Sequence, residues 1–230
     1  MTTSHGTILL IGASRGLGLG LAGEYLARGW RVIATVRDPG KAHGLTALRD
    51  SHPDKLRIEA LDVMEANGAT RLAGRLAGER VDVLFVVAGR SGHTTSPIHE
   101  VPAEGAALEF LTNAYAPPVV AEALMGLLAP HAPVVFMTSI LGSIANNAGG
   151  MELYRASKAA LNMFGSLFGV RHADRAVILM HPGWVRTDMG GSSAPLDVPT
   201  SVRGMADVIA AHGGKRGVAY LDYTGATIPW

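Results

Sequence analysis

The sequence predicts an α/β protein, a doubly wound parallel sheet of about seven strands with helices on both faces. Three features of the chain support this fold class. Short apolar runs alternate with longer segments of helical periodicity. Most short runs are almost continuous in Val, Ile and Leu, as in strands covered on both faces. Gly and Pro gather at the joints, and no linker or repeat interrupts the pattern. We therefore expect a single domain over residues 1–230.

The individual elements follow from this alternation. Strands are expected where aliphatic residues run together between turn signals. The candidates are Thr7–Ile11, Arg31–Val36, Leu56–Leu61, Val81–Val87, Pro133–Thr138, Ala176–His181 and Gly217–Leu221. Helices are expected where apolar residues recur at helical spacing. The candidates are Leu17–Arg28, Asn67–Gly78, Glu104–Leu128, Met151–His172 and Ser201–Ala211. A strand followed by a helix, repeated in this order, produces right-handed crossovers and a parallel sheet.

Composition excludes several classes of function. The chain has 48% hydrophobic and 17% charged residues, which is typical of a globular protein. Its twenty basic and nineteen acidic residues nearly cancel, which argues against a nucleic-acid partner bound through bulk charge. Cysteine is absent and the histidines lack metal-binding spacing, so we expect no metal site. No apolar stretch approaches the roughly 20 residues of a membrane span, and Met1–Gly6 has no signal-peptide features. We expect a soluble, cytoplasmic protein with no membrane partner.

A glycine-rich turn lies between the first candidate strand and the first candidate helix. Glycines there allow a tight turn and let the backbone approach a pyrophosphate, whose charge is favoured at a helix N-terminus. A tight turn without a ligand is the alternative, but the flanking strand and helix favour a Rossmann-type dinucleotide site. The candidate cofactor-binding residues in this turn are Gly12, Ser14, Arg15, Gly16, Leu17 and Gly18.

The end of the second strand indicates which dinucleotide is preferred. A carboxylate there would bind the adenosine ribose and repel a 2′-phosphate. The sequence instead places Val36 at the expected ribose-facing position, followed by Arg37. The guanidinium groups of Arg15 and Arg37 can converge on a 2′-phosphate. Alternatively, both arginines are solvated and Asp38 contacts the ribose. The charges favour NADP(H) over NAD(H).

The candidate chemical centre is a tyrosine and a lysine four residues apart, Tyr154 and Lys158, which share one helix face. A cation beside a phenol lowers the pKa of the phenol. A phenol tuned in this way can exchange a proton with a carbonyl or an alcohol. Ser139 follows the fifth candidate strand, where its hydroxyl can bind the substrate oxygen. Asn113 falls inside a candidate helix, where a surface asparagine is the ordinary alternative.

These motifs resemble those of classical short-chain dehydrogenases/reductases over essentially the whole chain. The turn is similar to the family's T-G-x-x-x-G-x-G, with Ile11 where Thr is usual. The segment 181–189, His-Pro-Gly-Trp-Val-Arg-Thr-Asp-Met, is similar to the Pro-Gly motif that follows the sixth strand in this family. The short loop after Met189, the segment Ser201–Met205 and the ending Asp222–Trp230 are similar to the C-factor and sniffer-like carbonyl reductase branch.

The resemblance implies a catalytic tetrad of Asn113, Ser139, Tyr154 and Lys158. Tyr154 would be the general acid, and Lys158 would lower its pKa and contact the nicotinamide ribose. Ser139 would stabilise the developing oxyanion, and Asn113 would hold a water that connects Lys158 to solvent. The family's N-N-A-G motif reads Val86-Val87-Ala88-Gly89 here, so the local hydrogen bonding differs. Further implied cofactor contacts are Asp62, Val63, Ala88, Gly89, Tyr154, Lys158, Pro182, Gly183, Val185 and Thr187.

The expected activity is NADP(H)-dependent reduction of a carbonyl compound to an alcohol, or the reverse. Apolar residues at the carboxyl ends of the strands suit a small-molecule substrate, a hydrophobic or aromatic ketone, aldehyde or quinone. The candidate substrate-binding residues are Ile140, Leu141, Trp184 and Met189. Two alternatives are a dinucleotide-binding signalling protein of C-factor type and a lyase or epimerase. Apolar residues around Glu104–Leu128 and Met151–Val170, including Phe164, also predict a homodimer or homotetramer.

Overall fold

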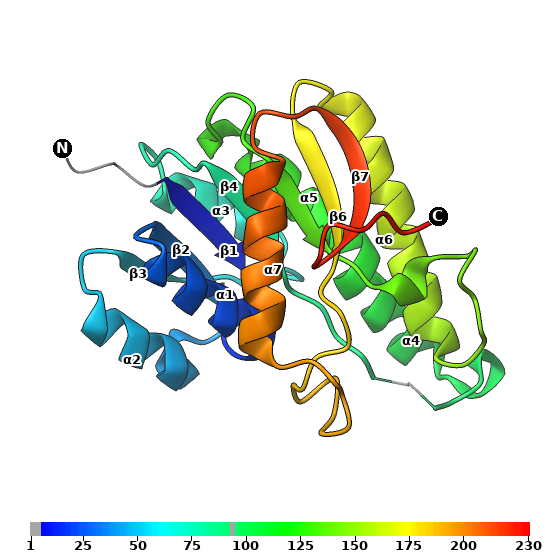
Figure 1. The fold of residues 1–230 in the computed structure, drawn as a ribbon. Coiled ribbons are helices and arrows are strands. Elements are labelled where there is room, and N and C mark those ends of the chain that lie inside the picture. The colour runs from blue at the N-terminus through cyan, green and yellow to red at the C-terminus, as the bar shows by residue number, and fades with distance from the viewer. Residues whose placement is uncertain (1–5, 93–94) are drawn as a thin grey trace.

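A computed structural model describes residues 6–92 and 95–230. Its centre is a seven-stranded sheet in which every neighbouring pair is parallel, with the order β3-β2-β1-β4-β5-β6-β7 (Figure 1). The strands are β1 Thr7–Ile11, β2 Arg31–Val36, β3 Leu56–Ala60, β4 Val83–Val86, β5 Val134–Met137, β6 Ala176–His181 and β7 Gly217–Asp222. The predicted doubly wound parallel sheet is confirmed. Because the strand order reverses between β1 and β4, the carboxyl ends of these strands are where such sheets bind ligands.

Seven α-helices accompany the strands in the described residues. They are α1 Gly16–Ala27, α2 His43–Ser51, α3 Gly68–Arg75, α4 Ala103–Phe110, α5 Ala116–Leu124, α6 Glu152–Arg171 and α7 Val198–Ala211. The sequence did not predict α2, whose single buried residue, Leu45, gives little periodic signal. The other helices occupy the predicted segments, but one of those segments is divided.

The continuous helix predicted over Glu104–Leu128 is wrong. A π-helical turn, Leu111–Tyr115, separates α4 from α5. Pro117 and Pro118 stand at the start of α5. Proline has no N–H, so neither residue can donate a helical hydrogen bond to the preceding turn, and the backbone widens there instead. This widened turn contains Asn113.

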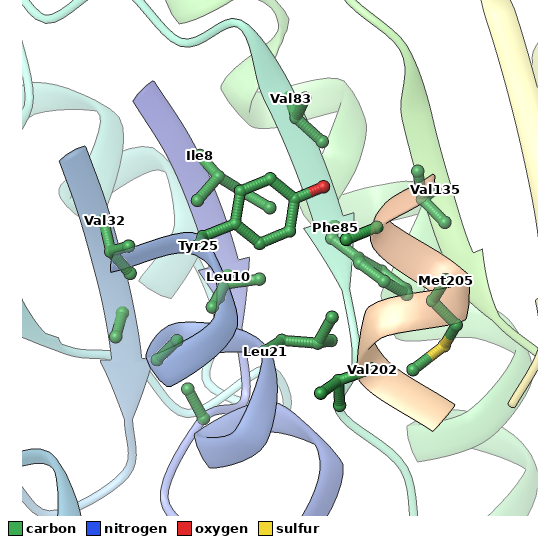
Figure 2. Packing of buried hydrophobic residues seen from close by; sticks show 14 of the residues in the cluster. Ile8, Leu10, Leu21, Tyr25, Val32, Val83, Phe85, Val135, Val202 and Met205 are labelled. Carbon is green, nitrogen blue, oxygen red and sulfur yellow. The ribbon is translucent and has the colours of Figure 1, made fainter. Parts of the chain in front are cut away.

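Helices cover both faces of the sheet, and each face has its own hydrophobic core. On one face, α1, α2 and α7 cover Ile8 and Leu10 of β1. Figure 2 shows this packing, with Leu21 of α1 and Met205 of α7 against the sheet. On the other face, α3, α5 and α6 cover the alternate β1 residues, as at Leu9. Burial on both faces explains why the strand sequences are almost continuously apolar.

Candidate active site

The glycine turn joins β1 to α1 and leaves the N-terminus of α1 uncapped. Gly12 has a left-handed backbone (φ +92°), and a Cβ there would lie 2.9 Å from Ala88. In the described part of the chain, the helix-preceding residue Arg15 makes no side-chain hydrogen bond to the first N–H groups of α1. No acidic residue stands in the first turn. The N–H groups and the positive end of the helix dipole can therefore bind a phosphate, so Gly16 and Gly18 fit the predicted dinucleotide site.

The remaining residues of the turn are held by neighbouring elements. The Gly12 N–H donates to Thr35 Oγ1 of β2 (3.0 Å), which ties the turn to the next strand. Ser14 is exposed, and Leu17 packs partly against the first core. Arg15 Nη1 pairs with Asp188 Oδ2 at 2.9 Å, and both side chains are exposed. This ion pair connects the turn with the loop after β6.

The end of β2 differs in one respect from the expectation. Val36 was predicted to face the ribose, but its side chain is buried in the first core, because it continues the alternating pattern of β2. The exposed residue at this edge is Arg37. Asp38 Oδ1 accepts a hydrogen bond from the Gly40 N–H (3.0 Å), and its other oxygen lies 3.4 Å from Lys41 Nζ. The nearby carboxylate is thus already engaged, whereas the guanidinium faces solvent.

The four predicted catalytic residues converge beyond β4 and β5. Ser139 follows β5, Asn113 lies in the π-helical turn, and Tyr154 and Lys158 lie on α6. A Cβ on Gly89 would lie 3.4 Å from Asn113 Oδ1 and 3.5 Å from Lys158 Nζ, so both groups border the same small space.

Lys158 is buried and has a backbone partner. Its Nζ donates to the Met137 carbonyl at the end of β5 (2.9 Å) and lies 5.7 Å from the centroid of the Tyr154 ring. Burial lowers the pKa of Lys158 to about 8, and the carboxylate of Glu109 opposes this change.

The predicted net lowering of the Tyr154 pKa is not found in this structure. Burial raises the pKa of Tyr154 to about 12; a hydrogen bond with Ser139 opposes the rise, and the Glu109 carboxylate adds to it. The ammonium group of Lys158 lies 5.7 Å from the ring centroid, and desolvation is the largest cause of the rise in the Tyr154 pKa. Tyr154 is therefore a protonated phenol at neutral pH.

Asn113 is fully buried, so the surface alternative is wrong. Its Nδ2 donates to the Arg90 carbonyl (2.8 Å) and to Ser157 Oγ (3.0 Å), and its Oδ1 accepts from the Arg90 N–H (2.8 Å). The asparagine thereby joins the loop after β4 to α6. The two valines Val86 and Val87 lie before this loop, and Val86 is buried in the second core.

The segment that carries Ser139 is fixed from two sides. Its Oγ accepts from the Leu141 N–H (3.2 Å) and so caps a short 3₁₀ helix, Ile140–Gly142. Its carbonyl accepts from the Tyr220 hydroxyl of β7 (2.5 Å). Farther along, the Ser143 hydroxyl donates to the carbonyl of Pro229 in the C-terminal tail (2.5 Å).

The loop after β6 brings its predicted cofactor residues to the same edge of the sheet. The Pro182 carbonyl accepts from Ser201 Oγ of α7 (2.6 Å), and Gly183 has a left-handed backbone (φ +84°). Val185 pairs with Leu196 in an isolated bridge. Thr187 Oγ1 accepts from the Gly190 N–H (3.1 Å). The Thr187 methyl group faces Gly16, where a Cβ would lie 3.6 Å from it. At the other end of the site, Asp62 and Val63 follow β3 and are half-buried.

The predicted substrate-binding residues present an apolar surface. Ile140, Trp184 and Met189 are exposed, and Leu141 is half-buried. The Trp184 ring is oriented by its Nε1, which donates to the Gly190 carbonyl (2.8 Å). These residues lie on the loops after β5 and β6, which leave the carboxyl edge of the sheet, the lower edge in Figure 1.

One charged residue of this region was not predicted from the sequence: Glu109 of α4 is 1% exposed. A glutamate in an amphipathic helix normally indicates a solvated face, and no motif marks this position. Among residues 6–92 and 95–230, no group of His, Asp or Glu side chains is arranged to hold a metal ion. No helix within these ranges is long and apolar enough to cross a membrane.

Comparisons with known proteins agree with this arrangement. A family model described as short chain dehydrogenase matches residues 6–196. The chain is 41% identical over 155 residues to C-signal of Myxococcus xanthus. The matched residues cover 65% of this chain and 93% of that protein. A crystal structure of a Burkholderia multivorans short-chain dehydrogenase/reductase with bound NADP has a TM-score of 0.95 and 45% identity, over 98% of this chain and 100% of that chain. The carbonyl reductase Sniffer of D. melanogaster has a TM-score of 0.91 and 33% identity, over 98% and 100% of the two chains. The chain belongs to the short-chain dehydrogenase family.

Proposed function

We propose that this protein is an NADP(H)-dependent carbonyl reductase that acts on hydrophobic ketones, aldehydes or quinones. The observation that carries the proposal is the pairing of half-buried Tyr154 with buried Lys158 on α6 beside Ser139, at the same edge of the sheet as the uncapped glycine turn. The structural neighbour from Burkholderia multivorans contains NADP, and Sniffer is a carbonyl reductase. These comparisons favour an oxidoreductase over a signalling protein, although C-signal is also a relative.

The chemistry uses one hydride and one proton. NADPH, when bound, supplies the hydride for the carbonyl carbon. Tyr154 gives its proton to the carbonyl oxygen, and a pKa of about 12 keeps this proton on the phenol until the oxygen becomes basic. The Ser139 hydroxyl donates to the same oxygen as negative charge develops on it. The ammonium group of Lys158 stabilises the tyrosinate that remains.

Asn113 is proposed to hold a water that returns a proton to Lys158 after Lys158 has given one to the tyrosinate. Its side-chain amide is engaged by Arg90 and Ser157. The backbone carbonyl of Asn113 cannot accept an α-helical hydrogen bond from residue 117 or a π-helical hydrogen bond from residue 118, because both residues are proline and have no N–H. The backbone carbonyl of Asn113 is therefore available as a water acceptor.

A turnover screen tests the function. Purified protein is mixed with NADPH or NADH and with a panel of ketones, aldehydes and quinones, and cofactor oxidation is followed by absorbance. We expect turnover of at least one apolar carbonyl compound, faster with NADPH. Absence of turnover across the panel, with NADPH binding intact, would count against the reductase.

The cofactor preference has a sharper test at Arg37. Arg37→Leu is expected to weaken NADPH binding by a factor of roughly ten to a hundred and to leave NADH binding nearly unchanged, because only NADPH carries the phosphate. Arg216→Leu is the matched control, because Arg216 is exposed just before β7, at the opposite edge of the sheet. Titration of each variant with both cofactors decides the point; equal losses for NADPH and NADH in Arg37→Leu would show that this arginine is not the phosphate partner.

A further inference from the structure

A buried asparagine of α6 holds the segment that carries Ser139 from both of its ends. Asn162 is 3% exposed, and its Oδ1 accepts a hydrogen bond from the Thr138 hydroxyl (2.7 Å). Its Nδ2 donates to the Gly142 carbonyl (3.2 Å). Thr138 directly precedes Ser139, and Gly142 ends the 3₁₀ turn that follows it. One side-chain amide therefore joins the residue before Ser139 to the last residue of the turn.

Lys158, the partner of the proposed proton donor, lies on the same face of α6. Asn162 follows it by four residues, so the two side chains are neighbours on successive turns of the helix. A Cβ on Gly142 would lie 2.8 Å from the Lys158 carbonyl carbon and 3.0 Å from Asn162 Nδ2. Lys158 Nζ also donates to the carbonyl of Met137, the residue before Thr138 (2.9 Å). The 3₁₀ turn and the end of β5 are thus fixed directly against α6 at Lys158.

Packing alone does not require an amide at this position. Apolar side chains such as Leu161 and Phe168 fill other buried positions of the same helix. Holding Thr138 and Gly142 at once requires a side chain with both an acceptor and a donor. Asparagine supplies both from one planar group, and its buried polar atoms need these partners. The particular contribution of Asn162 is therefore to fix the distance between α6 and the Ser139 segment.

This distance determines where the Ser139 hydroxyl lies relative to the Tyr154 phenol. The two groups belong to different elements, because Ser139 follows β5 and Tyr154 lies on α6. In the proposed reaction both donate to the same carbonyl oxygen of the substrate. O–H···O hydrogen bonds span about 2.5–3.0 Å, so a small shift of the turn against α6 removes one of the two. The Tyr220 hydroxyl ties the Ser139 carbonyl to β7, and Asn162 ties the same segment to α6.

We propose that Asn162 is a positioning residue that acts through Ser139: its amide holds the Ser139 hydroxyl against the face of α6 that carries Tyr154 and Lys158. The inference rests on the proposed function, but the position of the turn is measurable in the cofactor-free protein without turnover.

The kinetic test asks whether Asn162 acts through Ser139. N162A removes both hydrogen bonds, and kcat is expected to fall about tenfold or more with little change in NADPH affinity. In the S139A background the same substitution should lower kcat by less than about twofold, because the group that it positions is already absent. T138V removes one of the two bonds and should lower kcat less than N162A does, whereas T138S keeps the hydroxyl and should retain the parental kcat. I209A is the stability control, because it opens a cavity in the first core near the end of α7, and its kcat should be unchanged.

The structural test needs no substrate. Ile140 directly follows Ser139, so its δ1-methyl NMR signal, assigned with I140V, reports the position of the turn. In N162A and T138V the Ile140 signal is expected to shift, while the signal of Ile8, in the first core on β1, stays in place. If N162A does not fold, the comparison of T138V with T138S measures the same contact.

Two results would overturn the role of Asn162. One is an Ile140 signal that stays in place in the folded variants that lack the hydrogen bonds. The other is an equal fall in kcat with and without the Ser139 hydroxyl, which would mean that Asn162 acts on turnover by another route. A parent protein that reduces no carbonyl compound, with an Ile140 signal that shifts in N162A, would contradict the reductase and still support the positioning of the turn.

Discussion

At the scale of single residues, the proposed role of Tyr154 as proton donor can be tested by removal of one oxygen atom. Tyr154→Phe keeps the ring and its packing and removes the transferable proton. Turnover is expected to fall by at least about a hundredfold, while NADPH affinity and melting temperature change little. Steady-state kinetics and a cofactor titration on the same sample measure both. Near-normal turnover in a folded Tyr154→Phe variant would exclude the phenol as the acid.

Lys158 is expected to reduce the stability of the folded protein. Its pKa is about 8 in the folded chain, against 10.5 for an ordinary lysine, so the unfolded chain binds this proton more tightly. The penalty is full below about pH 8 and is relieved as the pH rises toward 10.5. Lys158→Met is therefore expected to stabilise the protein near neutral pH by about 1–3 kcal/mol, after subtraction of the lost hydrogen bond to Met137.

Thermal melting at several pH values checks this sign. The gain in Lys158→Met should be largest near pH 7 and should shrink as the pH approaches 10.5. Lys215→Met is the control, because Lys215 is exposed, and it should show no such trend. A gain that is independent of pH, or a loss of stability near pH 7, would contradict the charge penalty.

Residue identity was more predictable than residue environment. The family resemblance indicated Tyr154 and Lys158, but the rise in the Tyr154 pKa depends on burial, which a spacing of four residues does not report. Glu109 was missed for the same reason, since its partner Gly92 lies on a distant loop. Val36 was predicted to face the ribose because it ends a strand. The alternation of side chains along β2 instead places Val36 in the first core.

At the scale of elements, strands were predicted better than helices. Every predicted strand end lies within two residues of the observed one, because burial on both faces makes these segments apolar throughout. The helix predicted over Glu104–Leu128 failed because its apolar periodicity continues through Pro117 and Pro118, while the backbone hydrogen bonding does not. The resulting π-helical turn contains Asn113, and apolar periodicity alone does not reveal this turn.

The C-terminal tail is expected to position the segment that carries Ser139. The Ala145 N–H donates to the Trp230 carbonyl (3.0 Å), and the Ser143 hydroxyl donates to the Pro229 carbonyl. Deletion of Pro229 and Trp230 removes both acceptors. We expect kcat to fall about tenfold or more, because a small displacement of a catalytic group is costly.

Cofactor affinity separates this effect from general unfolding. NADPH binding should be retained in the tail deletion, since the glycine turn and Arg37 follow β1 and β2, away from the tail on β7. Trp230→Phe keeps the backbone carbonyl and should keep most of the turnover. Normal kcat in the deletion variant would show that the tail does not position Ser139.

At the scale of the whole molecule, the described surface includes an apolar area that the fold itself does not cover. It lies on α4, the π-helical turn, α5 and α6, and its exposed residues are Leu108, Phe110, Leu111, Tyr115, Val119, Met163, Leu167 and Val170. Monomeric soluble proteins rarely expose a large contiguous apolar area. Phe164, predicted at a subunit interface, is half-buried beside it. A second copy of the chain, related by a two-fold axis, can cover the same residues on both subunits.

We therefore predict a homodimer or a homotetramer that buries these helices. One chain has a mass of 24.0 kDa, so sedimentation equilibrium at micromolar concentration should give roughly two or four times this value. Met163 and Val170 are 61% and 73% exposed, so Met163→Glu combined with Val170→Glu should change the isolated chain little and dissociate the assembly. Met64→Glu, an exposed apolar position after β3, is the control and should leave the mass unchanged. Because α6 also carries Tyr154 and Lys158, dissociation should lower turnover as well as mass. A fully active monomer in the unsubstituted protein would disprove the assembly and its coupling to the active site.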